Sequence, residues 1–124
     1  MMRLFLALGA IFGGLAVAGG AFASHALKAQ LSERSLEIFE TGARYQMYHA
    51  LALIAVAILA EQGQEKALWF TIAGSAFTLG IGLFSGSLYA LSLSGIGWLG
   101  AITPLGGAAL LVGWGCVAIA ALQR

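Results

Sequence analysis

The sequence predicts an all-α integral membrane protein, a bundle of about four transmembrane helices. Of its 124 residues, 60% are hydrophobic and only 9% are charged, whereas a soluble domain carries about 25% charged residues. The mean hydropathy is +0.94, and no residue from Ala67 to Gln123 is charged. Because so few charges cannot cover a soluble domain of this size, we expect the bilayer to be its solvent.

The first predicted span covers about residues 4–24. Its apolar run, Leu4–Ala23, follows Arg3 and contains no charge. About 20 helical residues at roughly 1.5 Å each match the ~30 Å hydrocarbon core. A secretory signal peptide has a similar pattern, with Ala21-Phe22-Ala23 as a possible cleavage site. Because the apolar run is longer than a usual signal core, we expect this helix to be retained.

A short amphipathic helix is predicted at about residues 33–44, before a second span at about 45–60. Ser32 is a suitable N-cap, and Glu33 follows in the first turn, where the helix dipole favours an acid. Apolar residues then recur three or four positions apart between acids, which is typical of a helix in the membrane interface. The two segments can also form one continuous helix. The second span ends before the polar turn at 61–66.

The uncharged C-terminal half is too long for one span and predicts two, at about 67–91 and 98–122. We expect the break within Ser92–Trp98, because Ser94-Gly95-Ile96-Gly97 has a low helix propensity. Thr103-Pro104 offers a second possible start for the last helix, as N-cap and first helical residue.

Small residues at four-residue spacing indicate how the spans pack. Gly9 and Gly13 lie in the first span, and the third span carries a stripe made of Gly74, Thr78, Gly82 and Gly86. Small residues at this spacing let helix backbones approach closely in lipid. We therefore expect the stripe to pack against another helix.

Four spans place both termini on one side of the membrane, but the charges do not decide which side. The cations divide three against three, with Arg3, Lys66 and Arg124 facing Lys28, Arg34 and Arg44. The concentration of basic residues in one short loop slightly favours a cytoplasmic position for residues 28–44.

Charge and cysteine content bear on the partners. With a net charge of +1 and scattered cations, the chain has no nucleic-acid footprint. Cys116 is the single cysteine, so it forms no intramolecular disulfide, and no Cys/His spacing resembles a zinc site. We expect no cofactor or metal. The expected partners are membrane lipid and either another membrane protein or a second copy of the chain.

A few polar residues within or beside the spans form a candidate cluster of unknown role: His25, Glu40, Arg44, Tyr45, Gln46, His49, Ser85, Ser87 and Tyr89. His25 ends the first span and His49 lies early in the second, so antiparallel helices would bring both toward one membrane face. Two imidazoles can ligate haem or a metal, or can be hydrogen-bonded structural groups.

Arg44 is expected either to pair with Glu40 in the interface or to turn inward, because an unpaired arginine at mid-bilayer costs roughly 2.5–3.5 kcal/mol. The hydroxyl groups of Ser85, Ser87 and Tyr89 are expected to join the third helix to the Tyr45–His49 region through buried hydrogen bonds. A nucleophilic serine is disfavoured, because no triad-type base lies near these serines in the sequence and the chain contains no aspartate.

Four motifs carry a resemblance to a known family: Gly20-Ala21-Phe22-Ala23-Ser24-His25-Ala26-Leu27, Thr41-Gly42-Ala43-Arg44-Tyr45-Gln46-Met47-Tyr48-His49-Ala50-Leu51-Ala52-Leu53, Phe84-Ser85-Gly86-Ser87-Leu88-Tyr89 and Ile102-Thr103-Pro104-Leu105-Gly106-Gly107. In this order they resemble the small bacterial inner-membrane proteins typified by YgdD and YwdK, to which the eukaryotic transmembrane protein 256 looks related. The resemblance implies a multi-pass inner-membrane protein without an established activity, and an uncleaved first helix.

Three functions follow as hypotheses. The first is a non-enzymatic scaffold or accessory subunit that packs against itself, lipid or a larger complex. The second is an oligomeric pore or small transporter, which needs several copies because four short helices enclose little volume. The third is a cofactor-binding redox protein that uses His25 and His49.

Overall fold

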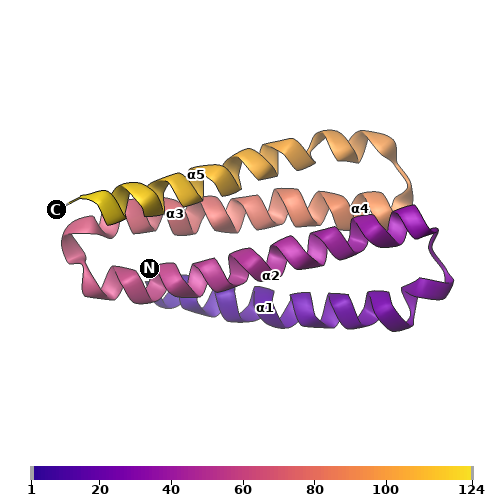
Figure 1. Cartoon of the computed structure of the whole chain (residues 1–124), viewed down its shortest axis with the longest axis horizontal. Helices are drawn as coiled ribbons and strands as arrows, with labels where there is room; N and C mark the ends of the chain where they lie inside the picture. The colour runs from indigo at the N-terminus through magenta and orange to yellow at the C-terminus, as the bar shows by residue number, and fades with distance from the viewer. Residues whose placement is uncertain (1, 124) are drawn as a thin grey trace.

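Four antiparallel helical rods make up the protein, as the computed structural model of residues 2–123 shows (Figure 1). Over this range, four helices are long and apolar enough to cross a membrane: Met2–His25, Glu33–Gln62, Gln64–Ser94 and Gly97–Leu122. The predicted fold class is therefore confirmed. Both ends of the chain lie at one end of the bundle, together with the turn between the second and third rods (Figure 1).

The first two rods are α1 (Met2–His25) and α2 (Glu33–Gln62), joined by a short 3₁₀ turn, η1 (Leu27–Ala29). Ser32 caps α2, because its side chain accepts a hydrogen bond from the Ser35 backbone nitrogen at 3.1 Å. Residues 33–44 do not form a separate helix: they are the first three turns of α2. The hydrogen-bond ladder continues into the second span because no proline interrupts it.

The third rod is one helical path with an irregular centre. It consists of α3 (Ala67–Gly80), a π-helical segment η3 (Ile81–Ser85) and α4 (Gly86–Ser94). It therefore ends three residues beyond the predicted limit at Leu91. Gly95 terminates it in the left-handed conformation, with φ of 72°, a backbone shape that glycine adopts without steric cost.

The last rod begins at Gly97, one residue before the predicted limit at Trp98, but its first turns are not α-helical. Residues Gly97–Ala101 form a 3₁₀ helix, η4, and α5 covers Thr103–Leu122 with Pro104 in its first turn. The rod as a whole thus begins near residue 98, and its α-helical part begins at Thr103-Pro104, the alternative start. Thr103 is not the N-cap, however, since Ile102 occupies that position and the Thr103 hydroxyl contacts Ser87 instead.

The core is formed by large side chains from every rod, and several of them lie against a glycine of a neighbouring rod. Phe77 is fully buried, and a Cβ added to Gly113 of α5 would lie 2.5 Å from its ring. In the same way, a Cβ on Gly9 would lie 2.8 Å from the Ala50 carbonyl oxygen of α2. Close backbone approach therefore holds α1 to α2 and α3 to α5, as expected for helices that associate in lipid.

The predicted small-residue stripe of the third rod does not act as one packing surface. Gly74 lies directly against the Phe5 ring of α1, whereas Gly82 and Gly86 face open space. Gly82 lies inside the π segment, and Gly86 follows it. One extra residue in a helical turn rotates the following side chains by about 100°, so spacing counted across residues 81–85 no longer marks one face.

Candidate functional site: a polar layer inside the bundle

A layer of buried polar side chains crosses the bundle where α2 meets its neighbours. Its centre is Gln46, which is buried in the middle of α2. The Gln46 side-chain nitrogen donates to the Phe12 carbonyl oxygen of α1 at 2.8 Å, and the Tyr89 hydroxyl of α4 donates to the Gln46 amide oxygen at 2.7 Å. One amide therefore links three helices.

Ser85 adds a second link from the third rod to α2. Its side chain is 1% exposed, and its hydroxyl donates to the Gly42 carbonyl oxygen at 2.7 Å. A Cβ on Gly42 would lie 2.9 Å from the Tyr89 ring, so the absence of a side chain there lets α4 approach. The expected bond from Tyr89 to the Tyr45–His49 region is thus present in the structure, whereas Ser85 bonds to Gly42, which lies before that region.

His49 joins α2 to α5. Its Nδ1 lies 2.7 Å from the Tyr45 carbonyl oxygen, and the Trp114 indole nitrogen donates to its Nε2 at 3.0 Å. A carbonyl only accepts and an indole N–H only donates. The ring must therefore be neutral, with its proton on Nδ1, and neither nitrogen is left free for a metal or haem iron.

Ser87 lies apart from this layer, contrary to expectation. Its hydroxyl donates to the Phe84 carbonyl oxygen at 2.9 Å and lies 2.6 Å from the Thr103 hydroxyl. It thus fastens α4 to the start of α5. Its place two residues after Ser85 along the third rod points it to a different neighbour, because successive helical residues are rotated by about 100°.

The two histidines do not converge. Gly13 of α1 lies against Ala50 of α2, so His49 lies level with the middle of α1. His25 is an exposed residue at the end of α1, about twelve residues or roughly 18 Å farther along. The prediction of a shared membrane face was wrong because the first three turns of α2 carry His49 away from the loop. Within residues 2–123, no three His, Cys, Asp or Glu residues are grouped closely enough to hold a metal ion.

Arg44 is neither buried nor paired with Glu40, which corrects both expectations for it. Its side chain is exposed, and the ion pair found among residues 2–123 joins Arg34 to Glu37 at 3.7 Å. Tyr45 is also turned outward, with its ring 4.9 Å from that of Phe84. The polar layer therefore consists of Gln46, His49, Ser85 and Tyr89, with the other candidates outside it.

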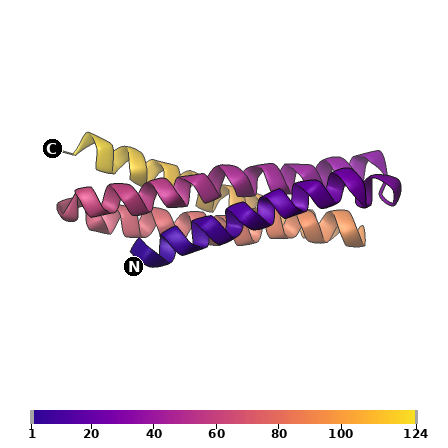
Figure 2. The same cartoon turned by 90° about the horizontal axis from the view of Figure 1, so that it is seen from below.

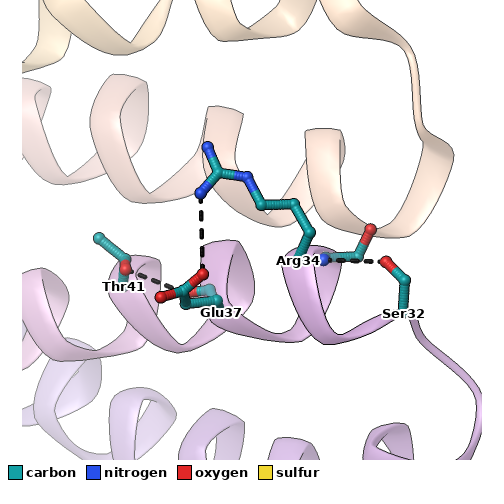
Figure 3. A network of polar contacts seen from close by, with 5 residues as sticks. Ser32, Arg34, Glu37 and Thr41 are labelled. Carbon is teal, nitrogen blue, oxygen red and sulfur yellow. Dashed lines mark hydrogen bonds and ion pairs between the residues drawn. The ribbon is translucent and has the colours of Figure 1, made fainter.

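A second polar network lies on the outer surface at the start of α2 (Figure 3). Arg34 and Glu37 are 81% and 70% exposed, and the Thr41 hydroxyl donates to the Glu37 carbonyl oxygen at 2.9 Å. An exposed ion pair of this kind contributes about 0–1 kcal/mol to the stability of the folded protein. This network supports the end of the helix, and we do not assign it a functional role.

The comparisons with known proteins identify the family. The chain matches the family model described as "Protein of unknown function (DUF423)" over residues 19–107. The membrane protein YwdK of Bacillus subtilis is 46% identical over 98% of both chains. The chain belongs to the DUF423 family. The resemblance stated from the motifs is thus confirmed.

Two further relatives come from other bacteria. A membrane protein of Haemophilus influenzae is 41% identical over 92% of this chain and 90% of the relative. The inner membrane protein YgdD of Escherichia coli is 35% identical over 98% of this chain and 91% of the relative. All three relatives are named as membrane proteins, and none of the names gives an enzymatic activity. No solved structure matches the chain.

The DUF423 match includes most of the polar layer but not all of it. Gln46, His49, Ser85 and Tyr89 lie within residues 19–107. Phe12 and Trp114, which supply partners for Gln46 and His49, lie outside that range. Nothing in the sequence pointed to either one, because Phe12 contributes only its backbone oxygen and Trp114 resembles any aromatic residue in an apolar run.

Nuclear magnetic resonance tests the state of His49. With ¹⁵N-labelled histidine in detergent or nanodiscs, we expect the neutral Nδ1–H tautomer for His49, because its two partners require it. Trp114→Phe removes the donor to Nε2 and should shift the Nε2 resonance while leaving that of His25 unchanged. A signal from the Nε2–H tautomer in the wild-type protein would contradict this hydrogen-bond arrangement.

Proposed function

We propose that this DUF423 protein is a non-catalytic accessory subunit or scaffold of the bacterial inner membrane, packed against a larger membrane protein. The observation that carries the proposal is that the buried polar groups bond to one another and to the backbone. Within the described range, every buried side-chain nitrogen or oxygen has a hydrogen-bond partner. A catalytic group needs free hydrogen-bonding capacity directed at a substrate, whereas Gln46 and His49 direct theirs to neighbouring helices.

The outer surface is the part of the molecule available for interaction. Large apolar side chains project from each rod, including Val17 of α1, Leu51 of α2, Leu79 of α3 and Leu111 of α5. Such residues lie against lipid or against another helix. YgdD is named as an inner membrane protein, which supports a location in the inner membrane for this chain.

The redox alternative needs His25 and His49 to act together, and their separation along the bundle counts against it. The oligomeric pore is the remaining rival, and it differs from an accessory subunit in what covers the outer surface. A pore needs further copies of this chain there, and an accessory subunit needs a different protein.

Photo-cross-linking in cells distinguishes these cases. A photoreactive amino acid is placed at Val17, Leu51, Leu79 or Leu111, one per variant, with expression at the native level. We expect one protein adduct larger than a dimer from one or two neighbouring faces, and lipid adducts from the others. A ladder of self-adducts would instead indicate the oligomeric pore, and lipid adducts at all four positions would contradict an accessory role.

A further inference from the structure

We infer that Arg44 and Glu40 form a binding site for the headgroup of phosphatidylethanolamine, a zwitterionic phospholipid, on the outer face of the α1–α2 pair. This inference concerns lipid and holds whether or not the protein is a subunit of a larger complex. It rests on the depth of Arg44, on the groove beside it and on the order of the two charges.

Arg44 lies beside the apolar part of α1. The two helices run along each other (Figures 1 and 2), and Gly19 of α1 lies against Phe39 and Ala43 of α2. Arg44 is therefore nearly level with Gly19. The apolar run of α1 ends at Ala23, so Arg44 lies roughly 6–10 Å inside the end of that run.

A cation at this depth needs an anionic partner. Arg44 is exposed, and no carboxylate among residues 2–123 lies within 4.0 Å of it. The aliphatic part of the Arg44 side chain can extend so that its guanidinium reaches the level of the lipid phosphates. Arginine binds phosphate oxygens through paired, charge-assisted hydrogen bonds. The bilayer supplies that anion at the required height.

A groove of about 310 Å³ runs beside Arg44 along the α1–α2 seam. The wall from α1 consists of small residues, Ala16, Gly20 and Ser24. A Cβ on Gly20 would meet nothing within 4 Å, and the Ser24 hydroxyl is already bonded to the Gly20 carbonyl oxygen at 3.0 Å. The groove is therefore open and its wall presents little unsatisfied polarity, which suits an acyl chain or the glycerol region of a lipid.

Glu40 decides the class of lipid. It lines the same groove and lies one helical turn closer to the bundle end than Arg44, about 6 Å along α2. An acid there repels a purely anionic headgroup. In phosphatidylethanolamine, an ethylene link joins the phosphate to a primary ammonium group, so a phosphate at Arg44 leaves the ammonium near Glu40. The quaternary nitrogen of phosphatidylcholine carries no N–H to donate to that carboxylate.

Native mass spectrometry of the purified full-length protein tests the site. The protein is exchanged into micelles that contain equal amounts of phosphatidylethanolamine, phosphatidylglycerol and phosphatidylcholine. We expect wild type to retain phosphatidylethanolamine over the other two by up to about fivefold, the ratio that corresponds to one partly exposed charge pair. Equal retention of the three lipids, or a preference for phosphatidylglycerol or phosphatidylcholine, would overturn the proposal.

The variants separate the three parts of the site. Glu40→Gln should abolish the preference for phosphatidylethanolamine, Arg44→Gln should lower retention of all three lipids, and Gly20→Leu should fill the groove without changing the charge. Wild-type lipid ratios in Glu40→Gln, or wild-type retention of all three lipids in Arg44→Gln, would also overturn the proposal.

Matched controls lie nearby but outside the groove. Lys28→Gln removes an exposed cation at the same end of the bundle, and Gly14→Leu adds the same side chain to α1 at a position where a Cβ also meets nothing within 4 Å. We expect wild-type lipid ratios from both. Equal losses in Gly14→Leu and Gly20→Leu would show that the groove is not the site.

Discussion

Replacing Gly106 with alanine is expected to lower the free energy of unfolding by about 1–3 kcal/mol, the usual cost of an overpacked contact. A Cβ at this position would overlap the backbone of Phe84 in the π segment, with the Phe84 Cα 2.7 Å away. Because a backbone has no alternative rotamer, the helices themselves would have to separate. Unfolding in mixed micelles, followed by circular dichroism, measures the loss.

Gly107→Ala is the matched control for this prediction. A Cβ on Gly107 would lie 3.9 Å from the Phe84 ring, an ordinary contact distance. Both substitutions add one methyl group to the first turns of α5 and raise helix propensity by about the same amount, up to ~1 kcal/mol. The difference between the two variants therefore isolates the contact with Phe84. Equal stability of the two would mean that α5 does not approach the π segment this closely.

Replacing Gln46 with methionine is expected to destabilise the protein by about 1–3 kcal/mol, because it leaves buried polar groups without partners. The Phe12 carbonyl oxygen loses the bond from the amide nitrogen, and the Tyr89 hydroxyl loses its acceptor. Methionine has a similar length and is apolar, so lost packing contributes little to the result. The same unfolding assay gives the free energy.

Tyr89→Phe and the double variant assign this loss to its two bonds. In Tyr89→Phe, the bond to Phe12 remains, so we expect a smaller effect, near the ~0.6 kcal/mol average for hydrogen bonds between transmembrane helices. Because Gln46→Met already removes the bond to Tyr89, the two single effects should sum to more than the effect of the double variant. Strict additivity would show that the Tyr89–Gln46 bond contributes nothing to stability.

The polar layer was only partly predictable. Gln46, His49, Ser85 and Tyr89 stood out as polar residues in apolar helices. The expected link from Tyr89 to the Tyr45–His49 region is present, but Ser85 bonds to Gly42 instead. The partner of His49 could not be predicted, because Trp114 lies 65 positions away in the sequence. Arg44 was expected to be paired or buried because the bilayer penalises a free charge, but its side chain points outward.

By itself, the sequence determined that this protein is a four-helix membrane bundle. The length, apolar content and low charge of each span are properties of that segment alone, so they can be read from the sequence. The break at Gly95 likewise follows from the local backbone preference of glycine. Only the tertiary structure decided which side chains meet. That outcome depends on the rotation of each helix about its own axis, and the π segment at residues 81–85 changes this rotation in the third rod. The periodicity of the sequence does not give the rotation of each helix. The rotation depends on contacts between helices, such as those of Gly42, Ser85 and Gly106.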